Sequence, residues 1–253
     1  DRLAHGQSFK FGSETTVNSR LSKKSLLPCR FGACLRRIMN WAVAARIKFP
    51  GERILASKID YKSAYRRCHL GASTAIQTCT QLPDDDLAII ALRLTFGGAP
   101  GPYEWGVISE SICDLAIAIM QDPSWNPSLL QSPEGKLVPP PTCLDESVPV
   151  AEGRDLIVDI PVDAKGTADV YIDDTIALAV DVKGSDNVKR LEQGTLLAIH
   201  CAAREKHNVE PIPREEMAAR AKLIAEAGAS EVKTILGWFF NFRSLTVTLA
   251  PNK

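Results

Sequence analysis

The stretch "ADVYIDDTIALAV", residues Ala168–Val180, places two adjacent carboxylates, Asp173 and Asp174, between two apolar segments. Valine, isoleucine and tyrosine on either side are typical of strands that are at least half buried. Neighbouring aspartates repel each other unless a cation lies against them, and a metal ion is one such cation. An acidic hairpin turn is the alternative, because Asp tolerates turn geometry well. The stretch therefore predicts a β-hairpin and leaves both roles of its acids open.

The size and composition of the chain indicate a globular protein. It has 253 residues, of which 45% are apolar and 24% are charged, enough to bury a substantial core. No segment has the layout of a signal peptide or the length of a membrane span, so we expect an intracellular protein without a membrane partner. The seven cysteines include no C-x-x-C pair, which favours reduced thiols over disulfides or a zinc site. The first residues, "DRLAHGQSFKFG", lack an initiator Met, and we expect an internal piece of a longer polypeptide.

The positive charge is concentrated in the first third of the chain. Residues 1–70 hold 15 lysines and arginines against four acids, a net charge of about +11 that the remaining residues cancel. If these side chains share one face, they suit a phosphate-rich partner. Alternatively, they only solvate the outside of a helix, as the positions of Arg36, Arg37, Arg46 and Lys48 allow.

Apolar spacing and turn residues predict an α+β fold with an antiparallel sheet backed by helices on one side. We expect helices at 33–48, 103–121, 185–204 and 213–227, and strands at 53–60, 73–80, 87–94 and 155–162, besides the hairpin at 168–180. The segment "LPDDD" predicts a turn between the second and third strands. The Pro-rich and Ser-rich stretch 123–154 reads as an exposed insertion, and two strand-like runs surround "NFRS" near the end.

Asp60 is a third acid that ends a buried-looking strand. If this strand and the hairpin are neighbours in one sheet, Asp60, Asp173 and Asp174 come together. Two Mg²⁺ ions would neutralise such a cluster, and paired ions are a general device for in-line phosphoryl transfer. The spacing predicts this arrangement only on the assumption that the strands are neighbours.

Five segments resemble motifs of the reverse transcriptases and follow one another in the family's order. The resemblance is strongest to retrotransposon enzymes, and the group that pairs the polymerase with a tyrosine recombinase is a candidate among them. "YIDD" at 171–174 is similar to the family's Y-x-D-D hairpin, and "KIDYKSAYRR" at 58–67 to its motif with an Asp followed by an aromatic. "LTFGGAPGPYEW" resembles the Phe-Gly segment, and "LGWFFNFRSLTVTL" the hairpin that grips the primer. "RLAHGQSF" and "VNSRL" resemble parts of the fingers.

The resemblance implies an RNA-directed DNA polymerase that adds deoxynucleotides to a primer 3′-hydroxyl with two Mg²⁺ or Mn²⁺ ions. Its catalytic and metal-binding residues would be Asp60, Asp173 and Asp174. The resemblance also implies contacts with the nucleotide by Arg2, Tyr65, Phe96 and Gly97, and with the primer end by Gly237 and Trp238. Tyr65 would exclude a ribose 2′-hydroxyl by steric blocking. Two roles for Lys233 stay open, proton donor to pyrophosphate or the lysine that precedes the primer grip.

The resemblance further implies a polymerase palm with partial fingers. We expect partial fingers at 1–57, the first part of the palm at 58–122, the insertion at 123–154, the second part of the palm at 155–230 and the primer-grip hairpin at 231–253. The partners would be a template with its primer, deoxynucleoside triphosphates and the remainder of a retroelement polyprotein. A degenerate domain that binds nucleic acid without catalysis is the alternative. A two-metal nuclease shares the acids but gives no reason for Tyr65.

Overall fold

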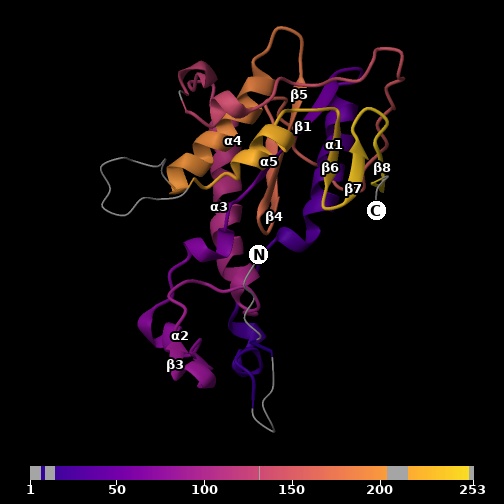
Figure 1. Cartoon of the computed structure of the whole chain (residues 1–253). Coiled ribbons are helices and arrows are strands. Elements are labelled where there is room, and N and C mark those ends of the chain that lie inside the picture. The colour runs from indigo at the N-terminus through magenta and orange to yellow at the C-terminus, as the bar shows by residue number, and fades with distance from the viewer. Residues whose placement is uncertain (1–6, 9–14, 131, 204–215, 251–253) are drawn as a thin grey trace. The chain divides into compact units, whose positions relative to one another are not determined.

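The computed structural model describes residues 7–8, 15–130, 132–203 and 216–250, and the chain divides into two units. The first unit combines Asp1–Cys29 with Ser63–Ile108, and the second combines Arg30–Lys62 with Ser109–Lys253. Figure 1 labels the elements of both. All three acids of the predicted metal site therefore belong to the second unit.

Three antiparallel strands form the central sheet of the second unit, in the order β1-β5-β4. They are β1 (Arg53–Asp60), β4 (Thr167–Tyr171) and β5 (Asp174–Asp181). β1 and β5 pair over their full length, from Arg53 opposite Asp181 to Asp60 opposite Asp174. The predicted strand at 53–60 and the predicted hairpin are confirmed. The fold is of the α+β class with antiparallel sheets, as the sequence predicts.

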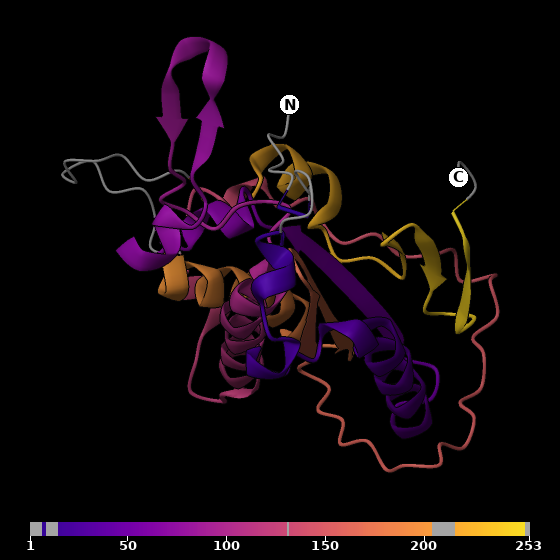
Figure 2. The same cartoon turned by 90° about the horizontal axis from the view of Figure 1, so that it is seen from below.

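Helices cover both faces of this sheet, although the sequence predicted them on one side. α1 (Cys34–Lys48) buries Ile38, Trp41 and Ala45 against one face, and η3 (Phe31–Ala33) precedes it. α4 (Asn187–Ala203) packs on β5 from the opposite side (Figures 1 and 2). Six consecutive residues of β5 are buried, so both of its faces are apolar and each requires a cover.

The four predicted helices are present with altered lengths. α1, α3 (Gly101–Gln121) and α4 match the predicted positions closely. α5 (Arg220–Glu226) begins later than the predicted helix at 213–227, whose first three residues lie outside the described part of the chain. No helix in the described part is long and apolar enough to cross a membrane.

A second antiparallel sheet of three strands follows α5. It comprises β6 (Val232–Ile235), β7 (Trp238–Asn241) and β8 (Thr246–Leu249), in that order. The first of the two predicted runs is split, because Leu236 and Gly237 form a tight turn with φ of 51° and 82°. The two predicted runs are separated at "NFRS" by a turn between Asn241 and Thr246, where the Asn241 side chain accepts hydrogen bonds from the backbone N–H groups of Arg243 and Ser244.

The insertion at 123–154 is fixed to this second sheet by a buried ion pair. Its described residues contain the short helices η6 (Pro127–Leu129) and η7 (Gly135–Leu137). Glu231 and Arg243 are 1% and 3% exposed and form two parallel hydrogen bonds of 2.9 and 2.7 Å. Arg243 also donates to the carbonyls of Asp145 and Val148, while Glu231 accepts from the Leu144 N–H. The later part of the insertion is thus a mostly exposed strap that is attached at residues 144–148.

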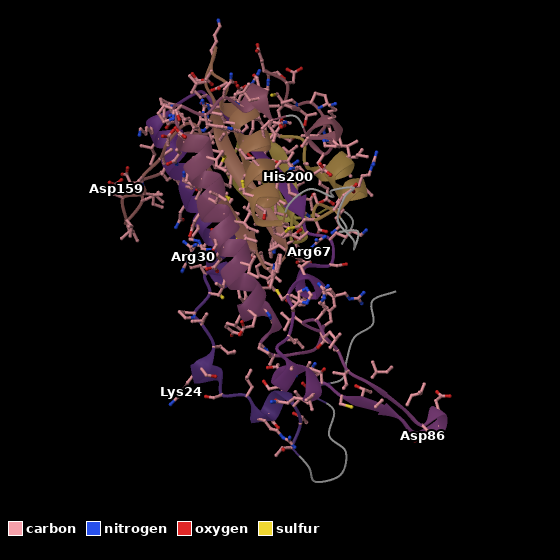
Figure 3. All side chains as sticks on the ribbon, turned by 90° about the vertical axis from the view of Figure 1, so that its left-hand side faces the viewer. Lys24, Arg30, Arg67, Asp86, Asp159 and His200 are labelled. Atoms are coloured by element: carbon pink, nitrogen blue, oxygen red, sulfur yellow. The ribbon has the colours of Figure 1, made fainter. Side chains whose placement is uncertain are left out.

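The strand predicted at 155–162 is wrong. The segment has no regular structure, Ile157 is fully exposed and Asp159 points into solvent (Figure 3). Only its end is anchored, where Val162 is buried and its carbonyl accepts a hydrogen bond of 2.7 Å from Lys48 Nζ. The apolar run finds no partner strand, and a strand without a partner leaves its backbone groups unpaired.

The first unit contains a short helix and a small hairpin where two longer strands were predicted. α2 (Ala72–Ile76) replaces the first half of the strand predicted at 73–80, and only β2 (Thr80–Leu82) and β3 (Leu87–Ile89) pair. The predicted turn is confirmed as η5 (Pro83–Asp85), with Asp86 at the tip (Figure 3). The remaining helical turns are η1 (Asn18–Arg20), η2 (Lys23–Ser25) and η4 (Ala64–Arg67).

We predict that Arg243→Met destabilises the protein by about 3 kcal/mol, because it leaves the Glu231 carboxylate buried without its partner. The double variant Arg243→Met with Glu231→Leu should recover a large part of this loss, since it removes both charges. Urea unfolding of the three proteins measures the free energies. Equal losses in the single and double variants would show that the charges do not compensate each other.

Candidate functional site

Asp60 and Asp174 lie side by side at one end of the central sheet. They are direct partners in the β1–β5 ladder, so both side chains point to the same face. Asp60 is 9% exposed, and Lys58 lies on this face because it precedes Asp60 by two residues in the strand. The condition that the sequence left open, that the two strands are neighbours, is therefore met.

Asp173 occupies the tip of the hairpin. Tyr171 and Asp174 are the last paired residues, so the turn consists of Ile172 and Asp173 alone. Ile172 has a φ of 56°, which is unfavourable for a β-branched residue. The Asp173 carbonyl accepts a hydrogen bond of 3.0 Å from the Tyr61 N–H, which extends the ladder past Asp60. Of the two adjacent acids, the second is thus the direct strand partner of Asp60.

Burial is the main cause that raises the pKa of Asp174 to about 6; the nearby carboxylates of Asp60 and Asp173 contribute to this rise, and Lys58 opposes it. One of its oxygens, Oδ1, is buried without a hydrogen bond. A carboxylate that is desolvated and incompletely bonded favours either a proton or a cation. The acid pair therefore favours the binding of a positively charged partner.

Helix α5 is held against the free edge of β1 by one bridge at each of its ends. Before the helix, Ala218 pairs with Tyr61, and the Ala219 N–H donates to the Asp60 carbonyl at 3.0 Å. After the helix, Ser230 pairs with Ala56. These two attachments place one side of α5 along the acidic end of β1.

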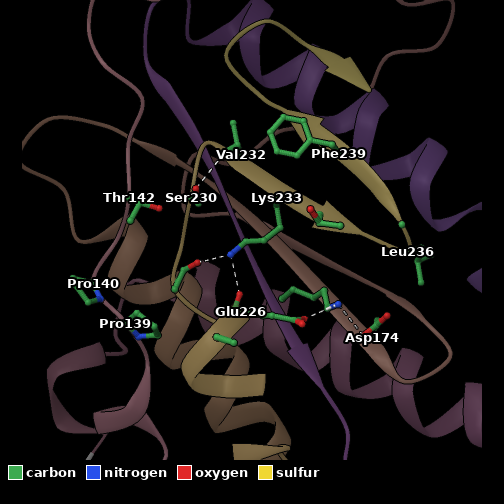
Figure 4. Close-up of a pocket in the computed structure, with 15 residues that line it drawn as sticks. Pro139, Pro140, Thr142, Asp174, Glu226, Ser230, Val232, Lys233, Leu236 and Phe239 are labelled. Carbon is green, nitrogen blue, oxygen red and sulfur yellow. Dashed lines mark hydrogen bonds and ion pairs between the residues drawn. The ribbon is translucent and has the colours of Figure 1, made fainter. Parts of the chain in front are cut away.

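Two side chains of α5, one turn apart, reach this end of β1. Lys222 Nζ lies 2.5 Å from Asp60 Oδ1. Glu226 Oε2 lies 2.7 Å from Lys58 Nζ, and the same ammonium is 3.5 Å from Asp174 Oδ1 (Figure 4). The site thus alternates acids and bases across two elements that are far apart in the sequence.

Sequence reasoning missed Lys58, Lys222 and Glu226. Lys58 had a usable signal, because its separation of two from Asp60 in a strand places both on one face. Lys222 and Glu226 share one face of a helix by their separation of four. Nothing in the sequence indicates that this face meets β1.

Lys233 of β6 caps the C-terminal end of α5. Its ammonium donates to the carbonyls of Glu226 and Gly228, at 2.8 and 2.6 Å (Figure 4). Lysines near a helix C-terminus commonly satisfy its last carbonyls in this way. Burial lowers the pKa of Lys233 to about 8. This arrangement favours a structural role over either of the two roles that the resemblance left open.

A pocket of about 560 Å³ adjoins the acid pair (Figure 4). Its wall includes Lys58, Asp174 and Glu226 on one side, and Gly237 and Phe239 of the second sheet on another. Trp238, by contrast, is 42% exposed and faces Leu249 across the β7–β8 ladder. Of the two predicted primer contacts, Gly237 lines this pocket.

The donor set suits a hard divalent cation that completes its coordination with ligands from outside the chain. No group of three or more His, Cys, Asp or Glu side chains in the described residues could hold a metal by itself. Mg²⁺ is nevertheless commonly bound through one or two carboxylates together with substrate phosphates and water. Asp60 and Asp174 supply two such carboxylates, and the buried oxygen of Asp174 lacks a hydrogen bond.

The first unit brings Tyr65 and Phe96 together. Their ring centroids are 5.0 Å apart, and a Cβ at Gly101 would lie 3.7 Å from the Tyr65 ring. Gly97 has a φ of 96° and its carbonyl accepts a hydrogen bond from Asn18 Nδ2. A residue with a side chain would be strained at this φ. Arg2, the remaining predicted nucleotide contact, lies outside the described residues.

Several basic residues of the first third are occupied by partners within the protein. Arg37 forms two hydrogen bonds with Asp169, and Arg46 is buried and donates to the carbonyls of Glu52 and Phe242. Arg30 likewise pairs with Glu110 and Asp114. Arg36 and Lys48 are exposed on α1, as the simpler interpretation of these charges predicts, but that interpretation is wrong for the buried Arg46. These arginines are therefore not one continuous surface for phosphates.

We predict that Asp174→Asn stabilises the metal-free protein by about 2 kcal/mol at pH 7.5 and has little effect at pH 4. The raised pKa means that the folded protein favours the protonated carboxyl. The wild-type protein therefore loses stability as the pH rises from about 4 through 6, and an amide avoids this loss. Urea unfolding in the presence of a chelator at both pH values measures the effect. The same change at both pH values would contradict the prediction.

No protein-family model, curated protein or solved structure matches this chain. The site itself consists of an acid pair at the end of two antiparallel strands, two lysines against it and an adjoining pocket.

Proposed function

We propose that this chain is an RNA-directed DNA polymerase domain, with its active site at the end of β1 and β5. The observation that carries the proposal is the strand register, which makes Asp60 the direct partner of Asp174 in the hairpin "YIDD". Two segments that are far apart in the sequence, and that each resemble a motif of the reverse transcriptases, thereby contribute acids to one end of the sheet. The antiparallel sheet with helices would be the polymerase palm.

The proposed reaction is attack of a primer 3′-hydroxyl on the α-phosphate of a deoxynucleoside triphosphate, with release of pyrophosphate. Asp60, Asp173 and Asp174 would hold two Mg²⁺ or Mn²⁺ ions, which when bound supply charge stabilisation for the entering and leaving oxygens. The chain itself would position these carboxylates by the β1–β5 ladder and desolvate them by burial. Lys58 would keep the Asp174 carboxylate in place.

The other predicted residues would contact substrates. Tyr65, supported by Phe96, would lie against the sugar of the nucleotide, with Gly97 allowing close backbone approach. Gly237 and Trp238 would contact the primer end. The template and primer would be held chiefly through their backbones, which carry little sequence information. The remainder of a retroelement polyprotein would supply further parts of the enzyme.

Primer extension tests the catalytic proposal. With an oligo-dT primer on poly-rA and Mg²⁺ or Mn²⁺, we expect extension by the wild-type chain and at least a 100-fold loss in Asp60→Asn and Asp173→Asn, because each removes a charge from the metal site. Asp159→Asn, an exposed acid without regular structure around it, is the matched control and should retain activity. A chelator should abolish extension in all proteins.

Full activity in the Asp60→Asn and Asp173→Asn variants would exclude the proposed site. Salt-sensitive binding of primer and template without extension would instead favour the degenerate domain that only binds nucleic acid.

We predict that Tyr65→Ala increases the use of ribonucleotides relative to deoxynucleotides by roughly 10- to 100-fold, because it opens space for the 2′-hydroxyl. Tyr65→Phe keeps the ring and should leave the preference unchanged. Single-nucleotide insertion with each substrate measures the ratio. An unchanged ratio in Tyr65→Ala would show that this ring does not contact the sugar.

A further inference from the structure

The two lysines at the acid pair are held in different ways. The Lys58 side chain is 11% exposed and lies between two carboxylates, those of Glu226 and Asp174. The Lys222 side chain is 44% exposed and its ion pair is with Asp60. Release of Lys58 would leave two partly buried carboxylates without a cation, whereas Lys222 can rotate from Asp60 into water.

The position of Lys222 coincides with that of a cation bound to Asp60. Its ammonium is in direct contact with Asp60 Oδ1, an oxygen that a divalent ion would also approach at about 2 Å. A divalent ion and an ammonium a few ångströms apart repel each other strongly in a partly desolvated site. The two cations therefore exclude each other from this carboxylate.

We propose that Lys222 is a tethered counter-cation, which neutralises Asp60 while the metal site is empty and is displaced when a divalent ion binds. Lys58 is the fixed cation of the same site, because its closer partner is Glu226 at 2.7 Å, against 3.5 Å for Asp174 Oδ1, and it remains on Glu226 when the ion binds. This inference rests on the metal site of the proposed function and concerns its regulation. The bridges at both ends of α5 keep Lys222 close enough to return when the ion leaves.

A purely stabilising role for Lys222 makes a different prediction. In that case Lys222 and the ion bind Asp60 together, and metal leaves the exposure of the lysine unchanged. The reactivity of the Lys222 amine with and without metal therefore distinguishes the two roles, and it does so without any measurement of catalysis.

The experiment labels the amines of the full chain with a brief pulse of an acetylating reagent, with and without Mn²⁺, and quantifies each lysine by mass spectrometry. We expect Mn²⁺ to increase the labelling of Lys222 by roughly twofold to fivefold, because an ion pair with a half-exposed lysine protects the amine only weakly. Lys58 should stay protected. Lys189 of α4, which donates to Ser128, is the control and should not respond. In Asp60→Asn, Lys222 should be labelled rapidly without metal and show no response to it.

Binding of Mn²⁺ is measured in parallel by electron paramagnetic resonance. This measurement distinguishes a failure of lysine displacement from a failure of metal binding. If Asp60→Asn loses a bound ion but Lys222 labelling in the wild-type chain ignores Mn²⁺, the displacement is wrong and the metal site stands. If the wild-type chain and Asp60→Asn bind Mn²⁺ equally, or neither binds it, the acid pair does not hold the ion by its own carboxylates, and this inference is overturned. Primer extension then tests the proposed function separately, because nucleotide phosphates complete the coordination in that assay.

Discussion

The antiparallel register of β1 against β5 is the constraint on which the rest of the site depends. Side chains alternate between faces along a strand, so a slip of one residue would move Asp60 away from Asp174 and turn the Lys58 and Asp60 side chains to the other face of the sheet. Because β5 is buried on both faces, that slip would place their charges among apolar side chains, which is costly. The apolar core thereby fixes the position of the acids at the end of the sheet.

The charges of the acid pair are balanced by a helix from a distant part of the chain. α5 meets β1 at both ends, and this places Lys222 and Glu226 in one alternating row with the acids and Lys58. Such a row neutralises Asp60 and Asp174 without a bound metal. The difference in exposure between the two lysines separates a permanent counter-cation from an exchangeable one.

A buried ion pair likewise joins distant parts of the chain at the second sheet. Glu231 and Arg243 direct their remaining hydrogen bonds to the backbone of residues 144–148, so an irregular segment is attached where it has no strands of its own. Residues 139–140, just before this strap, also line the pocket beside Asp174. The insertion is therefore part of the wall around the candidate site.

The sequence by itself determined the elements whose signals are local: the strand at 53–60, the hairpin of Asp173 and Asp174, the helices and the tight turns. It failed for the apolar run at 155–162, because a strand needs a partner, and no local pattern says whether one is present. It also gave no sign of Lys222 beside Asp60. Only the tertiary structure decided the neighbours of the acids, since the position of α5 on β1 depends on backbone bridges between residues about 160 apart.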